Sequence, residues 1–121
     1  MDEIKKFRDY RDLLVWQKSL ALVKSIYQLT KKFPNSEIYV LSSQVQRAAI
    51  SIPSNIAEGQ CRQHHGEFKQ FLYIALGSSG EVDTQIIIAK QLGYISQDEL
   101  SEIHTQIEEI RRLIRGLIAK L

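Results

Sequence analysis

The chain has 121 residues, of which 44% are hydrophobic and 25% are charged, with one cysteine and a formal net charge of +2. These average values argue against a disordered chain, and a domain of this length buries an ordinary core without metal or disulfide staples. A lone cysteine excludes an internal disulfide framework, which fits a reducing compartment. The lack of any run of ~18 apolar residues argues against a membrane helix. We therefore expect a soluble cytoplasmic protein. We expect one domain over residues 1–121, with residues 1–11, which lack the apolar core of a secretory signal, as a flexible arm.

The first helix is predicted from Asp12, a suitable N-cap, to the residue before Pro34, because proline disfavours helical backbone in its predecessor. Its apolar residues form two adjacent strips that cover about 200°, whereas a helix packed on one side needs only ~100°. One strip comprises Leu13, Trp16, Leu20, Val23 and Tyr27, and the other comprises Leu22, Ile26, Leu29 and Phe33. The excess needs burial elsewhere, and Leu22, Ile26 and Leu29 are our candidates for an oligomer interface.

The second helix is predicted to begin at a cap on Asn35 or Ser36 and to end at Gly59 or a few residues later at Arg62. Its apolar face comprises Ile38, Leu41, Val45, Ala49, Ile52 and Ile56. Pro53 lies in the interior, where proline kinks a helix and costs ~3 kcal/mol or more. Because the strips stay in register across it, we favour a kinked continuous helix over a break with Pro53 restarting the helix.

A polar stripe also runs along the second helix, with its members within about 80° of one another. It comprises Gln44, Arg47, Ser51, Asn55, Glu58 and Arg62. An ordinary solvated face is one interpretation, but Ser, Asn and Gln are weaker choices for such a face than Lys and Glu. The stripe otherwise indicates a hydrogen-bonded contact with another helix or the wall of a wet groove. The candidates for a shared site that binds nucleic acid or a partner are Arg47, Asn55, Glu58 and Arg62.

The third helix is predicted from about His64 to a C-cap at Gly93. Its seam alternates steps of four and three through Phe68, Leu72, Ala75, Ser79, Val82, Ile86 and Ala89. Gly77 and Gly80 lie inside it, where each costs about 0.8–1.0 kcal/mol relative to alanine. Because small residues let a neighbouring backbone approach, we assign both to a helix crossing or a subunit contact, with a local break in the helix as the alternative.

The fourth helix opens at Ser96, with Glu99 three positions later in the pattern of a capping box. Its seam comprises Ile103, Ile107, Ile110, Ile114, Leu117 and Leu121. Acids near its start and bases near its end complement the helix dipole. Short connections make consecutive helices antiparallel neighbours, so we expect an all-α, up-down-up-down antiparallel four-helix bundle.

Three stretches resemble one known family: YRDLLVWQKSLALV, RAAISIPSNIAEG and EFKQFLYIALGSSGEVDTQIIIAKQLGY. They are similar to four-helix-bundle proteins encoded in intervening sequences of bacterial large-subunit ribosomal RNA genes, over about Tyr10 to Ala119. The resemblance implies a ring-like homopentamer with a role in nucleic-acid binding. The family is also similar to the accessory protein of diversity-generating retroelements, a basic pentamer that associates with a reverse transcriptase. A net charge of only +2 departs from that relative and favours weak to moderate nucleic-acid binding.

Basic side chains are the candidate phosphate contacts, because Lys and Arg dominate affinity for nucleic acids. They are Lys5, Lys6, Arg8 and Arg11 in the arm, Lys18, Lys24, Lys31 and Lys32 on the first helix, and Arg111, Arg112, Arg115 and Lys120 on the fourth. We expect a non-enzymatic homo-oligomeric adaptor, a pentamer, that binds RNA or DNA. The alternative is a protein scaffold or a reverse-transcriptase accessory without nucleic-acid binding of its own.

Metal-dependent and enzymatic functions have weaker support. No Glu is followed by His three residues later, as in di-iron bundles. Four side chains that can bind metal ions lie close together in the sequence after the second helix, but so many potential ligands in one short loop usually occur by chance. They are Cys61, His64, His65 and Glu67. The serines of SSG lack a nucleophile elbow, and no phosphate-binding glycine loop follows a strand. We therefore expect no catalysis, no cofactor and no bound metal.

Overall fold

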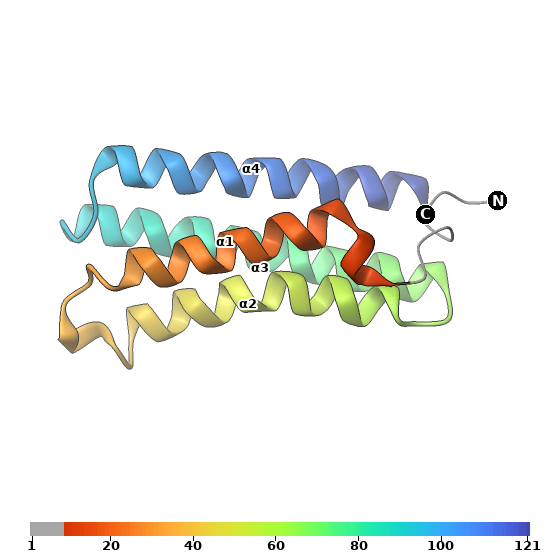
Figure 1. The fold of residues 1–121 in the computed structure, drawn as a ribbon, viewed down its shortest axis with the longest axis horizontal. Coiled ribbons are helices and arrows are strands. Elements are labelled where there is room, and N and C mark those ends of the chain that lie inside the picture. Colours follow the sequence, from red (N-terminus) through yellow and green to blue (C-terminus); the bar gives the residue numbers. More distant parts are fainter. Residues whose placement is uncertain (1–8) are drawn as a thin grey trace.

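The fold of this chain, taken from a computed structural model that describes residues 9–121, consists of helices within that range. They are η2 (Tyr10–Asp12), α1 (Leu14–Thr30), η3 (Asn35–Glu37), α2 (Leu41–Gln60), α3 (His65–Gln91) and α4 (Gln97–Lys120), where η marks a 3-10 helix. The four α-helices lie side by side, and each runs back along the one before it (Figure 1). The protein is therefore an all-α four-helix bundle, as the sequence predicts.

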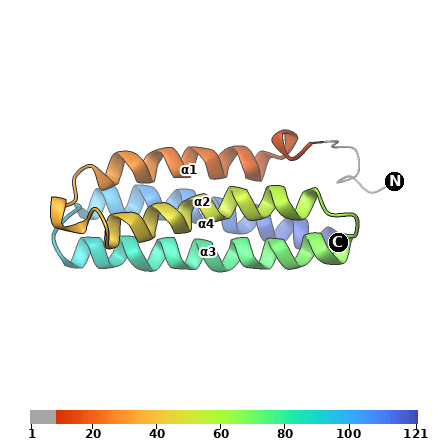
Figure 2. The same cartoon turned by 90° about the horizontal axis from the view of Figure 1, so that it is seen from below.

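The bundle places α1 and α3 at opposite corners. The helix pairs in contact are α1 with α2, α2 with α3, α3 with α4 and α4 with α1. The view of Figure 2 accordingly has α1 and α3 on opposite sides, with α2 and α4 between them. All four helices contribute fully buried side chains to one apolar core, among them Ile26, Ile52, Leu72 and Ile107. Burying each such side chain contributes about 1.5–3 kcal/mol, so this core is the main source of stability.

The start of α1 differs from the prediction. Asp12 is the last residue of η2, and the N-cap of α1 is Leu13, which makes no side-chain capping bond. The capping carboxylate belongs to Asp9, which accepts a hydrogen bond of 2.8 Å from the backbone N–H of Arg11. The predicted cap at Asp12 is therefore wrong, because an extra 3-10 turn precedes the helix.

The predicted arm over residues 1–11 extends too far into the chain. Tyr10 is half-buried, and its ring centroid lies 5.3 Å from that of Trp16 in α1. Arg11 lies in η2 and forms an exposed ion pair with Asp9. Residues 9–11 thus belong to the folded body, whereas Lys5, Lys6 and Arg8 lie outside the described residues.

The start of α2 also differs from the prediction, because a turn of 3-10 helix replaces its first residues. Asn35 and Ser36 lie in η3, α2 begins only at Leu41, and Ile38 is exposed instead of lying on the buried face. Glu37 holds this turn, since one carboxylate oxygen accepts from the Leu41 N–H at 3.3 Å. Its other oxygen accepts from the hydroxyl of Tyr94, at 2.7 Å. This contact with the α3–α4 connection is invisible to local capping rules.

The interior and end of α2 agree with the continuous-helix prediction. Pro53 is buried within the helix, so the alternative of a break and restart at this residue is wrong. The bend that we expect there stays a prediction. The helix ends at Gln60, between the two ends that the sequence suggests.

The last two helices follow their predicted boundaries closely. α3 is continuous, so the alternative of a break around Gly77 and Gly80 is wrong, and its seven predicted seam residues are buried. Gly93 has a φ of +81°, the left-handed conformation that a helix C-terminus commonly uses. The capping box of α4 is confirmed, since the hydroxyl of Ser96 accepts from the Glu99 N–H and the Glu99 carboxylate accepts from the Ser96 N–H.

We expect the charge of Glu99 to make stability depend on acid. Contact with Lys32 and a backbone hydrogen bond from Ser96 hold the pKa of this carboxyl below its ordinary value. Because the folded-state pKa is the lower one, the stabilisation is present above the unfolded-state pKa and is lost as the pH falls through the folded-state value. Glu99→Gln, which keeps a capping-box side chain, should therefore lower the melting temperature at pH 7 and progressively less towards about pH 2.

Thermal unfolding at a series of pH values measures this effect, with the exposed Glu102→Gln as the matched control on the same helix. A difference between Glu99→Gln and wild type that stays constant down to low pH would contradict it.

Candidate functional site

The middle of the polar stripe joins α2 to α3 within the chain. The hydroxyl oxygens of Ser51 and Ser78 lie 2.8 Å apart, and the Asn55 amide donates to the Ser51 carbonyl and hydroxyl at 2.8 and 2.9 Å. For Ser51, the predicted hydrogen-bonded contact with another helix is therefore confirmed, and the partner is α3 of the same chain. Asn55 thus donates both of these hydrogen bonds to Ser51, the residue that contacts α3.

The end of the stripe closes the α2–α3 turn. A guanidinium nitrogen of Arg62 lies 3.5 Å from Glu58 and another lies 3.8 Å from Glu67, while the guanidinium carbon lies 5.0 Å from the centre of the Phe71 ring. Arg47 is fifteen residues away, or roughly 22 Å along a helix. The structure thus divides the predicted set of four residues and does not bring Arg47 together with Arg62.

Arg47 instead lines a shallow groove between α2 and α3. The lining residues are Gln44, Arg47, Ala48 and Ser51 from α2 and Glu81 and Gln85 from α3. The Oε1 atom of Gln85 is buried and accepts no hydrogen bond within residues 9–121. Buried acceptors are normally satisfied, so a donor is expected here. Glu81 and Gln85 were not predicted as site residues, although their spacing of four residues places them on one helix face.

The close approach between helices occurs at a glycine other than the two that the sequence suggested. A Cβ atom built on Gly59 would lie 2.6 Å from the Cβ of Phe71 and 3.0 Å from a ring carbon of Phe68, so α3 packs directly on this backbone. A Cβ on Gly77 would meet nothing within 4 Å, and one on Gly80 would meet only Arg111, at 3.7 Å. The helix crossing assigned to Gly77 and Gly80 is therefore wrong within the chain, and their assignment to a subunit contact stays a prediction.

The oligomer interface assigned to the second strip of α1 is also wrong in its residues. Leu22 and Ile26 are 0% exposed and Leu29 is 7% exposed, so all three face the core of their own chain. The other strip leaves Leu20 43% and Tyr27 42% exposed, and Leu14, which belongs to neither strip, is 54% exposed. Periodicity detected the excess apolar arc but could not tell which half faces inward.

Most of the basic candidates in the described part of the chain fall into two groups. One group forms ion pairs with carboxylates: Lys18 with Glu109 at 3.1 Å, Lys32 with Glu99, Arg62 with Glu58 and Glu67, and Arg111 with Glu108 at 3.7 Å. The other group has no such pair within the described part of the chain and comprises Lys24, Lys31, Arg47, Arg112 and Arg115, all of them exposed. The second group is the one available to bind phosphates.

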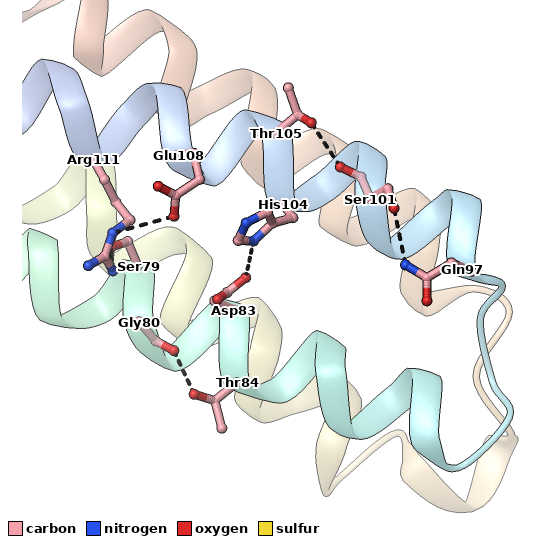
Figure 3. A network of polar contacts seen from close by, with 10 residues as sticks. All are labelled: Ser79, Gly80, Asp83, Thr84, Gln97, Ser101, His104, Thr105, Glu108 and Arg111. Carbon is pink, nitrogen blue, oxygen red and sulfur yellow. Dashed lines mark hydrogen bonds and ion pairs between the residues drawn. The ribbon is translucent and has the colours of Figure 1, made fainter.

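A seam of polar contacts joins α3 to α4 (Figure 3). Arg111 donates to the hydroxyl of Ser79 at 3.2 Å, and the Nδ1 atom of His104 lies 2.8 Å from a carboxylate oxygen of Asp83. The Ser79 hydroxyl itself donates to the carbonyl of Leu76. These bonds position the helices and leave Arg111 half-buried at the seam.

The described residues contain neither a cluster of metal ligands nor a membrane-spanning helix. Among residues 9–121, no three His, Cys, Asp or Glu side chains gather closely enough to hold a metal ion. Cys61 is exposed, at the end of α2. None of the helices in the same range has the length and apolar character needed to cross a membrane.

Comparisons with known proteins identify the family. Residues 11–116 match the family described as 23S rRNA-intervening sequence protein. The fold is similar to the solved structure of a protein of unknown function from the S23 ribosomal protein family of Bacteroides thetaiotaomicron, with a TM-score of 0.80 and 29% sequence identity. That match covers 87% of this chain and 98% of the other. No curated protein matches this sequence. This chain belongs to the family of 23S rRNA-intervening sequence proteins.

Proposed function

We propose that this chain is a non-enzymatic homo-oligomeric adaptor, a pentamer, that binds nucleic acid with weak to moderate affinity in the cytoplasm. The observation that carries the proposal is the apolar surface that the folded chain leaves open on two opposite corners, with Leu20 and Tyr27 on α1 and Tyr73 and Ile74 on α3. Several large apolar side chains left open on one helix face point to an interaction site in a soluble protein. Self-association is the simplest function for this exposed apolar surface.

The proposed nucleic-acid binding rests on the basic side chains that form no ion pair with a carboxylate in the described part of the chain. Arg112 and Arg115 are three residues apart on the exposed side of α4, and Lys31 follows the end of α1. The family's description, which places its members in 23S rRNA intervening sequences, is consistent with an RNA partner. A ring would repeat each weak contact around its axis, and multivalency would then raise the overall affinity.

A protein scaffold or reverse-transcriptase accessory without its own nucleic-acid binding is the second candidate. Ion pairs already occupy Lys18, Arg62 and Arg111, which were candidates for binding nucleic acid. The remaining positive surface is smaller than the sequence alone suggests.

We expect the wild-type oligomer to bind a structured RNA and a DNA duplex with an affinity that falls as salt rises. Replacing both Arg112 and Arg115 with alanine should weaken binding and flatten the salt dependence, because each phosphate contact contributes ~0.9 to the slope on duplex DNA. Fluorescence anisotropy at several salt concentrations gives the slope, and light scattering on the same sample gives the assembly mass.

Arg62→Ala is the matched control, since that arginine is already paired with Glu58 and Glu67. If an intact oligomer binds neither probe at low salt, the nucleic-acid part is wrong and the scaffold function is favoured.

A further inference from the structure

The outward face of α3 has an unusual composition for a helix surface. Among the exposed residues of His65–Gln91, Glu81 is the only charged one. Tyr73 is 55% exposed and Ile74 is 50% exposed, and Ile88 is exposed further along the same face. A helix that is apolar on several sides is normally covered on those sides. Within residues 9–121 no other helix lies over this face, because α3 contacts only α2 and α4 and α1 lies at the opposite corner of the bundle.

A shallow hollow lies in the middle of this face. Gly77, Gly80, Glu81, Thr84 and Gln85 line it, and a Cβ atom on Gly77 would meet nothing within 4 Å. Glycine in an exposed helix interior costs about 0.8–1.0 kcal/mol relative to alanine, and the folded chain has no packing need for it at this residue. A partner side chain that enters the hollow would explain why glycine is present at this residue.

The outward face of α4 provides the contrast within the same molecule. Its exposed residues include Asp98, Glu102, Arg112, Arg115 and Lys120, the charged composition that water favours. The shortage of charge on the outward face of α3 is therefore specific to that helix and does not reflect the composition of the whole chain. The outward face of α3 thus has the composition of a protein-contact surface.

The exposed strip of α1 has the complementary properties. Leu20 and Tyr27 project from it, and Lys24 lies between them at helical spacing. The sequence of α1, LVWQKSLALVKSIYQLT, contains no acidic residue, and Lys24 forms no ion pair within the described part of the chain. Large apolar side chains beside a cation on α1 thus match a hollowed apolar face beside an anion on α3.

We propose that α1 of a second copy of this chain docks on the outward face of α3, with Lys24 of the second copy beside Glu81 and Leu20 or Tyr27 in the hollow at Gly77. This assignment rests on the self-assembly in the proposed function and names the surfaces that carry it. Because the two faces lie at opposite corners, the contact is head-to-tail: each copy can use its α1 face on one neighbour and its α3 face on another. Such a contact builds a closed ring or an open filament, not a twofold dimer.

Charge reversal tests the pairing without disturbing the fold, because Lys24 and Glu81 are both exposed. Lys24→Glu and Glu81→Lys should each weaken assembly by about tenfold or more, since each places like charges together at the contact. The double variant restores opposite charges and should regain the wild-type assembly. Sedimentation over a range of concentrations measures the change, with circular dichroism to confirm folding.

Two further variants sharpen the test. Gly77→Leu fills the hollow and should also weaken assembly, although it replaces glycine with a better helix former. Arg115→Glu reverses an exposed charge on α4, outside both faces, and should leave the assembly mass unchanged.

The outcomes separate this inference from the proposed function. A wild-type protein that stays at the 13.9 kDa monomer mass at all concentrations overturns both. A wild-type oligomer that Lys24→Glu, Glu81→Lys and Gly77→Leu all leave intact overturns the face assignment and leaves self-assembly standing. Single variants that weaken assembly with no recovery in the double variant overturn the Lys24–Glu81 pairing.

Discussion

Leu22→Glu should prevent stable folding, whereas Leu20→Glu, two residues earlier, should leave the monomer folded. Leu22 is 0% exposed in the core, so the variant must place a carboxylate among apolar side chains or protonate it, at a cost of several kcal/mol. It also loses the ~1.5–3 kcal/mol that burial of leucine contributes. The sum approaches the ~5–15 kcal/mol total stability of a typical domain. Leu20 is 43% exposed, so a carboxylate there stays in water.

Circular dichroism and thermal unfolding distinguish the two variants directly. Leu22→Glu should lack a cooperative melt at pH 7, and Leu20→Glu should melt close to wild type while assembling less well. A folded, cooperative Leu22→Glu monomer would contradict the placement of this side chain in the core. It would instead support the original assignment of Leu22 and Ile26 to an oligomer interface.

Gly59→Ala and Gly77→Ala should change stability in opposite directions. Both gain ~0.8–1.0 kcal/mol of helix propensity. At Gly59 the new methyl group would lie 2.6 Å from the Cβ of Phe71, so α2 and α3 must move apart. Overpacking of this kind costs about 1–3 kcal/mol, which offsets or exceeds the gain. At Gly77 nothing lies within 4 Å, so the gain remains.

Urea unfolding under conditions where wild type and variants are monomeric gives both free energies. Gly59→Leu extends the series, because a larger side chain must open the crossing further while keeping high helix propensity. Stabilisation by both alanine variants would contradict the close crossing at Gly59. Destabilisation by Gly77→Ala would contradict the open space at Gly77.

The candidate site was only partly predictable from the sequence. A hydrogen bond to another helix, one of the interpretations of the polar stripe, is confirmed for Ser51, but Ser78 as its partner required the relative rotation of α2 and α3. The pairing of Arg111 with Glu108 follows from their spacing on one helix. The pairs Lys18 with Glu109 and Lys32 with Glu99 join α1 to α4, and sequence spacing contains no information on such contacts.

The sequence by itself determined the helical class, the seams of α3 and α4 and the capping box at Ser96, because periodicity and capping depend on residues within a turn or two of one another. Only the tertiary structure decided that Leu22 faces inward while Leu20 faces water, and that Gly59, not Gly77, lies at the crossing. Those outcomes depend on how each helix is rotated about its axis against its neighbours. That rotation minimises the free energy of the whole core, and no single helix encodes it.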